Sequence, residues 1–166
     1  LGEGGMGVVY EVLHTITQHR RALKILRLGA GADENERVRL LREASAAGRI
    51  GNPHITETYD AGTLDSGETY VLMEILAGES LATTLKRRRR LPVGEAVDIV
   101  IQTCDALSAA HAANIVHRDI KPANLYLTYP NGEGTRPFVK VLDFGVSKFD
   151  AGADALTDLT GEGMLI

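Results

Sequence analysis

The segment from His117 to Asn124, with the sequence HRDIKPAN, constrains this chain more than any other feature. It brings an aspartate, a lysine and an asparagine close together, and the acidic motif Asp143-Phe144-Gly145 follows it. A pattern that fixes five residue types in eight positions arises by chance about once in three million starts. These residues supply a carboxylate base, a cation and two oxygen ligands for a metal, the groups that phosphoryl transfer from ATP requires.

A glycine-rich segment opens the chain, and residues 1–9 read LGEGGMGVV, which is a G-x-G-x-x-G-x-V pattern. Glycines let the backbone approach phosphates closely, but on its own such a loop is often only a hairpin turn. The next residues, VVYEVL over 8–13, predict a strand and not a helix. This context excludes a Rossmann-type dinucleotide fingerprint.

Lys24 lies in an alternating segment, ALKIL, in which Ala22, Lys24 and Leu26 share one face of a predicted strand. A lysine in an apolar strand is commonly an edge residue with a solvated ammonium, but here it follows the glycine loop at a distance suited to phosphates. A charged helix is predicted over about 34–49. Glu43, beside the apolar stripe of that helix, is either a solvated glutamate or the ion-pair partner of Lys24.

These motifs together resemble those of eukaryotic-like protein kinases, and most of all those of bacterial serine/threonine kinases. The run Gly4-Gly5-Met6-Gly7-Val8-Val9-Tyr10 and the HRDIKPAN segment are typical of that group. The resemblance covers essentially the whole chain. It implies an α+β, two-lobed fold, with an antiparallel sheet and one helix in residues 1–76 and a mainly helical, truncated lobe in residues 77–166.

The resemblance also implies catalytic roles. Asp119 would accept the proton of the substrate hydroxyl, and Lys121 would neutralise the transferring phosphoryl group. Asn124 and Asp143 would hold magnesium, while Glu43 would hold Lys24 over the phosphates. A histidine beside an Arg-Asp pair suggests a general base, but the resemblance favours a packing role for His117.

The same resemblance implies an ATP site. Met73 would be the gatekeeper, and the backbone at Glu74 and Leu76 would bind the purine. Tyr126 occupies a position that is usually aliphatic, so that it either stacks on adenine or tilts away. The complete set of implied nucleotide-binding residues is Leu1, Gly2, Glu3, Gly4, Gly5, Gly7, Val9, Ala22, Lys24, Met73, Glu74, Leu76, Tyr126 and Asp143.

The resemblance also indicates the substrate class, through the residues that follow Asp119. The Lys121-Pro122 pair favours proteins phosphorylated on serine or threonine. Arg118 matches kinases whose activation segment is ordered by phosphorylation; Thr160 and then Thr157 are the candidate sites, with unmodified loop threonines as the alternative.

The net charge of −4 gives no indication of nucleic-acid binding. The basic run 86–90 is either a solvated loop or a contact for a polyanion or an anionic membrane.

Cys104 is the only cysteine, which excludes an intrachain disulfide and fits a reducing compartment. It is predicted to be buried on a helix over about 93–113, where apolar residues recur at core spacing: Val97, Val100, Ile101 and Leu107. The residues 129–137 are predicted to form a lengthened hairpin loop at the surface. No run is long enough to span a membrane, so the expected location is cytoplasmic, with any anchor outside this chain.

Leu1 is not a start methionine and the chain ends on Met164-Leu165-Ile166, so we expect a fragment that ends inside the activation segment. The leading hypothesis is an active serine/threonine kinase or its catalytic core. The alternatives are a nucleotide-binding pseudokinase or scaffold, and an inactive truncation. The scaffold is disfavoured because none of five key residues is replaced: Lys24, Glu43, Asp119, Asn124 and Asp143.

Overall fold

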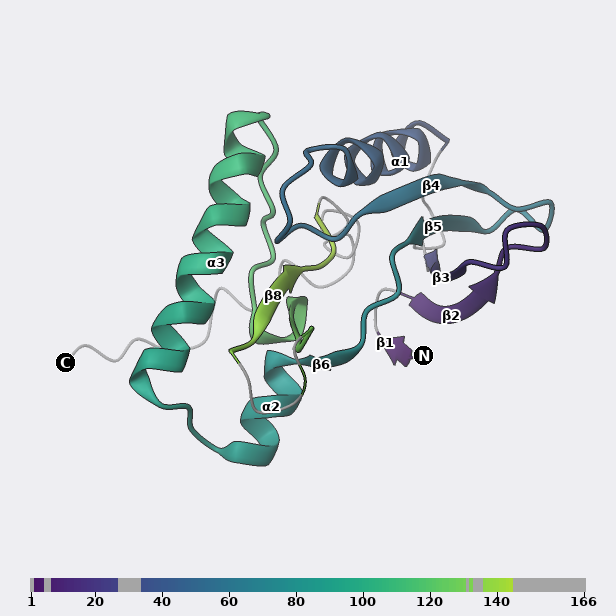
Figure 1. The fold of residues 1–166 in the computed structure, drawn as a ribbon. Coiled ribbons are helices and arrows are strands. Elements are labelled where there is room, and N and C mark those ends of the chain that lie inside the picture. Colours follow the sequence, from purple (N-terminus) through teal and green to yellow (C-terminus); the bar gives the residue numbers. More distant parts are fainter. Residues whose placement is uncertain (1, 5–6, 27–33, 131, 133–135, 145–166) are drawn as a thin grey trace, which may run out of the picture.

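The computed structural model of the chain describes residues 2–4, 7–26, 34–130, 132 and 136–144. These residues form two antiparallel sheets, one of five strands and one of three, with helices packed beside them (Figure 1). The expected α+β fold with an antiparallel sheet and one helix in its first part is therefore confirmed.

The first sheet has the strand order β1-β2-β3-β5-β4. The alternation predicted for β3 is present, because Ala22, Lys24 and Leu26 are buried while the residues between them are half-buried. Figure 1 shows α1 lying along β4 and β5. The elements of this part are β1 (Gly2–Gly4), β2 (Gly7–Leu13), β3 (Arg20–Leu26), α1 (Glu34–Gly48), β4 (Thr58–Thr63) and β5 (Thr69–Met73).

A hydrophobic core cluster packs against the second sheet, β6-β7-β8. Its centre is fully buried and consists of residues from β7, β8 and α3: Leu127, Val139, Val141, Ala106 and Ala110. The elements are β6 (Gly78–Ser80), α2 (Leu81–Arg88), α3 (Val93–Ala112), the short 3-10 helix η1 (Pro122–Asn124), β7 (Leu125–Thr128) and β8 (Phe138–Val141).

The buried amide of Gln102 joins α3 to the start of β8. Its Nε2 donates to the carbonyl of Pro137 at 3.0 Å, and its Oε1 accepts from the backbone N–H of Val139 at 3.0 Å. A buried polar side chain is tolerated when its hydrogen bonds are made, and here both ends of the amide are satisfied.

The segment 54–56 connects the two sheets by running beside the end of β8. Ile55 and Val141 form a parallel bridge. The N–H of Val141 donates to the carbonyl of His54 at 2.7 Å, and the N–H of Thr56 donates to the carbonyl of Val141 at 3.1 Å. Asp143, two residues after Val141, is thereby placed next to the first sheet.

The face of α3 that packs differs from the predicted one. Val97, Val100 and Ile101 are 49%, 58% and 58% exposed, and Cys104 is exposed as well. The buried face instead carries Ile99, Gln102, Thr103, Ala106 and Ala110. The prediction of a buried Cys104 is wrong because α3 is apolar on two faces, and β8 packs against the face where alanines allow close approach.

The hairpin loop after β7 is described only in part. The N–H of Gly132 donates to the carbonyl of Tyr129 at 3.0 Å, and Arg136 pairs with Asp98 of α3 at 2.7 Å. Arg136 is exposed, in agreement with a loop at the surface. None of the helices in the described ranges is both long and apolar enough to cross a membrane.

Candidate active site

Lys24 projects from the buried face of β3 and meets Asp143 across the junction of the two sheets. The Lys24 Nζ lies 2.5 Å from Asp143 Oδ1. Asp143 has a backbone φ of 61°, in the left-handed region, which is uncommon for a residue with a side chain. Glu43, the predicted partner of Lys24, belongs to α1, but its side chain lies outside the described residues. The ion pair between Lys24 and Glu43 stays a prediction.

His117 fixes the loop that carries Asp119. It is 1% exposed, and its Nδ1 accepts from the backbone N–H of Asp119 at 3.2 Å. The proton is therefore on Nε2, which donates to the carbonyl of Leu142 at 2.7 Å. Burial lowers the pKa of His117 below its ordinary value, so the ring is neutral at neutral pH. These contacts support a packing role for His117 and not a role as general base.

The Asp119 carboxylate is held by two donors. Lys121 Nζ lies 2.8 Å from Oδ2, and Asn124 Nδ2 donates to the same oxygen at 3.0 Å and to the Asp119 carbonyl at 2.8 Å. Burial alone would raise the pKa of Asp119, but the hydrogen bonds from Lys121 and Asn124 outweigh it and lower the pKa below its ordinary value. Asp119 is therefore an ionised acceptor at neutral pH.

Asn124 ends η1 and is buried beside the segment that carries Asp143. Its carbonyl accepts from the N–H of Leu142 at 2.9 Å, which brings Asn124 next to Asp143. Since Nδ2 donates to Asp119, the oxygen of the same amide is the atom left to act as a metal ligand. An amide oxygen and a carboxylate are the kinds of ligand that Mg²⁺ takes in phosphoryl-transfer sites, where it keeps waters and substrate phosphates in its shell. Asn124 and Asp143 therefore fit this ion.

A small cavity lies beside Lys24 and Asp143. Met73 lines it from β5, and Val141 and Phe144 line it from the end of β8 and the residues that follow. Met73 lies opposite Ala22 in the register of β3 and β5. These two predicted nucleotide-binding residues are therefore neighbours on adjacent strands. The Glu74 N–H donates to the carbonyl of Glu57 at 3.0 Å, which leaves only the carbonyl of Glu74 for a purine.

Comparisons with known proteins identify the family of this chain. The protein kinase domain family matches residues 1–162. The chain belongs to the protein kinase family.

Two curated relatives are bacterial kinases. The chain is 38% identical over 165 residues to the serine/threonine-protein kinase pkn3 of Myxococcus xanthus, covering 99% of this chain and 30% of pkn3. It is 40% identical over 147 residues to the serine/threonine-protein kinase PknE of Mycobacterium bovis, covering 89% of this chain and 25% of PknE. The chain thus spans less than a third of the length of either relative.

A solved structure shares the fold. The crystal structure of the Mycobacterium tuberculosis PknI kinase domain matches with a TM-score of 0.77 and 35% identity. The match covers 93% of this chain and 64% of that chain. The fold of this chain is therefore a protein kinase fold.

The kinase glycine loop is described on both sides of its tip. Gly4 pairs with Gly7, so β1 and β2 form an antiparallel hairpin, as the exclusion of a Rossmann fold requires. Gly7 has a φ of 143°, and a Cβ there would lie 2.0 Å from the carbonyl oxygen of Ile25. Only glycine fits this position. Leu1 and Gly5 lie outside the described residues, as do Thr157 and Thr160.

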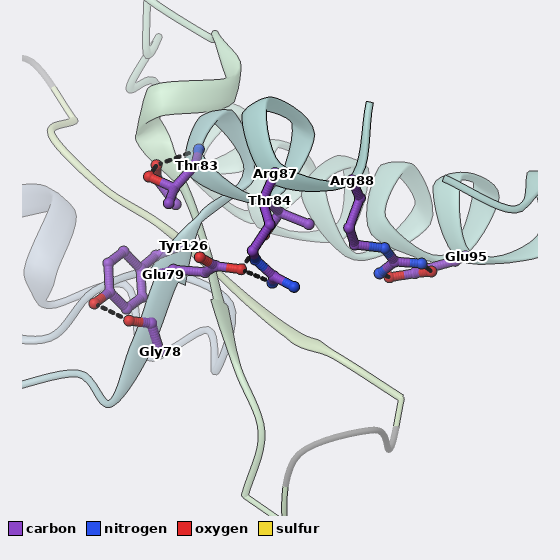
Figure 2. A network of polar contacts seen from close by, with 9 residues as sticks. Gly78, Glu79, Thr83, Thr84, Arg87, Arg88, Glu95 and Tyr126 are labelled. Atoms are coloured by element: carbon purple, nitrogen blue, oxygen red, sulfur yellow. Dashed lines mark hydrogen bonds and ion pairs between the residues drawn. The ribbon is translucent and has the colours of Figure 1, made fainter. Parts of the chain in front are cut away.

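Tyr126 makes a contact that the sequence did not predict. Its hydroxyl donates to the carbonyl of Gly78 at 2.7 Å, which ties the ring to β6 (Figure 2). Burial, and then the negative charge of Glu79, raise the pKa of Tyr126. The side chain is thus a neutral donor engaged with the backbone at the start of the second sheet.

Part of the basic run 86–90 is used within the molecule. Arg87 pairs with Glu79, whose carboxylate also accepts from Thr84, and the pKa of Glu79 is lowered, mainly by the hydrogen bond from Arg87. Arg88 binds both oxygens of Glu95 at 2.7 and 2.8 Å (Figure 2). The run is therefore neither wholly solvated nor wholly available to a polyanion. The sequence could have indicated this network, because Glu79 and Glu95 lie on either side of the basic run.

Proposed function

We propose that this chain forms the ATP-binding and catalytic part of a serine/threonine protein kinase, which transfers the γ-phosphate of ATP to serine or threonine hydroxyls of proteins. One observation carries the proposal. The ionised Asp119, held by Lys121 and Asn124, lies in the same site as Asp143, which is held by the buried Lys24.

The side chains divide the chemistry among them. Asp119 accepts the proton of the attacking hydroxyl, and Lys121 stabilises the negative charge on the transferred group. Lys24 binds nucleotide phosphates, and Glu43 holds Lys24. Asn124 and Asp143 would hold Mg²⁺, which when bound offsets the charge of the phosphates.

The nucleotide is proposed to lie between the two sheets, which correspond to lobes of residues 1–76 and 77–166. The loop formed by Leu1, Gly2, Glu3, Gly4, Gly5 and Gly7 covers the phosphates through its backbone. The purine contacts are Val9, Ala22, Met73, Glu74, Leu76 and Tyr126.

The proposed substrates are proteins, including the kinase itself at Thr160 or Thr157. Arg118 precedes Asp119, is exposed and has a φ of 69°. A phosphate on either threonine would pair with this guanidinium. The relatives come from bacteria, so a cytoplasmic kinase domain is the proposed location.

The test is transfer of labelled γ-phosphate from Mg-ATP to the protein and to a generic serine/threonine substrate. This chain, the full-length protein and its Asp119→Ala variant are compared, with Asp65→Ala in an exposed turn as the matched control. Transfer by the full-length protein and by Asp65→Ala, lost in Asp119→Ala, is expected. If the full-length protein binds nucleotide but transfers no phosphate, the kinase proposal is wrong and a nucleotide-binding scaffold takes its place.

A further inference from the structure

A second lysine-carboxylate pair joins the two sheets away from Lys24. Lys140 of β8 and Glu74, the first residue after β5, lie 2.6 Å apart. Their side chains are only 16% and 19% exposed. Ion pairs at the surface contribute little, whereas a pair that is mostly removed from water is screened less and its partners depend on each other.

The Glu74 carboxylate does more than neutralise Lys140. The same oxygen, Oε1, accepts from the backbone N–H of Glu57 at 2.8 Å, while the Glu74 N–H donates to the Glu57 carbonyl. Lys140 Nζ also lies 3.5 Å from the carbonyl of Ile55. One carboxylate oxygen therefore connects three segments: residues 55–57, the linker that begins at Glu74, and β8.

Each of the three segments leads directly to the candidate site. Ile55 and Thr56 line the cavity beside Lys24. Met73, which precedes Glu74, lines it too, and Asp143 follows Lys140 by three residues. A change in how the linker sits against β8 would move the purine-binding backbone relative to Asp143.

We infer that Glu74 and Lys140 are positioning residues that hold the linker 74–77 against β8 and so preorganise the nucleotide site. This inference rests on the proposed function. The pair does not touch the reacting atoms, and its effect is to remove the freedom that the linker would otherwise lose when nucleotide binds.

The test uses the full-length protein with Lys140→Met, Glu74→Gln and the double variant. We expect Lys140→Met to raise both the Kd for Mg-ADP and the KM for ATP by about tenfold, with kcat changed less than about twofold. The double variant should be no worse than either single variant, because the two residues act as one unit. Lys140→Arg keeps the charge and should restore most of the affinity.

The matched control is Lys86→Met, an exposed lysine of α2 for which we expect an unchanged Kd. A purely structural role would lower the fraction of folded protein, and hence kcat, without changing KM. A folded Lys140→Met variant with unchanged Kd and KM overturns the inference. If Lys140→Met does not fold, the same comparison is made with Glu74→Gln and Lys140→Arg.

Hydrogen exchange without nucleotide separates this inference from the proposed function. The amides of Glu57 and Glu74 should exchange faster in Glu74→Gln and Lys140→Met than in the parent protein. Absence of phosphate transfer by the parent protein would remove the proposed function. Unchanged exchange of these amides in the variants would remove the positioning role, whatever the transfer assay shows.

Discussion

The two lysine-aspartate pairs of the candidate site are chemically alike and differently built. In the pair Lys24–Asp143 the side chains are 8% and 19% exposed, and the partners are 119 residues apart in the chain. In the pair Lys121–Asp119 the side chains are 48% and 23% exposed, and only one residue separates the partners. The first pair depends on the whole fold, whereas the second is set within one loop.

The difference assigns the two lysines different work. A buried ammonium needs a negative partner at all times. In the proposed function, Lys24 would therefore exchange Asp143 for a phosphate of the nucleotide. The half-exposed ammonium of Lys121 is stabilised by water and can leave Asp119 when a substrate hydroxyl approaches. The site thus combines a buried lysine that always needs an anionic partner with a half-exposed lysine that does not.

The largest effect is expected for Asp119→Asn, which keeps the shape of the side chain and removes its charge. Phosphate transfer should fall by about 10² to 10⁴-fold, because the proton of the hydroxyl loses its acceptor. Stability should change little. Steady-state transfer measured beside Asp65→Asn checks this, and transfer at the parent rate would show that Asp119 is not the base.

Lys24→Met tests the buried pair. It leaves the Asp143 carboxylate without its cation in a mostly buried position, and we expect a loss of about 1 to 3 kcal/mol in the free energy of unfolding. Nucleotide affinity should fall as well. Urea denaturation and Mg-ADP titration measure both quantities, with Lys86→Met as the control. Equal stability of the two variants would contradict the distinction between the pairs.

Lys121→Met tests the exposed pair in the same assay. Since solvent screens this pair, the free energy of unfolding should change by no more than about 1 kcal/mol. A loss as large as that of Lys24→Met would mean that burial does not separate the two pairs.

The smallest effect concerns His117, which lies between the two aspartates. Its pKa lies below the ordinary value of 6.5, so the unfolded chain takes up a proton at His117 before the folded chain does. The free energy of unfolding should therefore fall as the pH drops below 6.5, and the contribution is fully present above it.

Denaturation of the parent and of His117→Gln between neutral and mildly acidic pH isolates this residue, because the other histidines contribute equally to both proteins. The difference between the two curves should shrink toward acidic pH. A constant difference would show that burial does not disfavour the charged ring.

Local patterns predicted most of the site. The HRDIKPAN segment located Asp119, Lys121 and Asn124, and the alternation around Lys24 placed Ala22, Lys24 and Leu26 on one face of a strand. Such patterns succeed because neighbouring residues in a strand or tight loop have few possible arrangements. The antiparallel sheet of the first part was predicted from the resemblance to protein kinases.

Relations between distant residues were not predictable in this way. Glu74 and Lys140 are 66 positions apart in the chain, and neither residue stands out in its own segment. The packed face of α3 was predicted wrongly because periodicity identifies apolar faces, and α3 has two of them. Only the position of β8 decides which face is buried.

The bridge between Ile55 and Val141 has a consequence for the order of folding. Forming this bridge closes a loop of more than eighty residues, which costs conformational entropy. Contacts between residues close in the chain, such as those of a hairpin, do not carry this cost. The hairpins of the first sheet can assemble without it. Because Lys24 and Asp143 meet only when β8 has docked against the first sheet, we expect the active site to be completed late in folding.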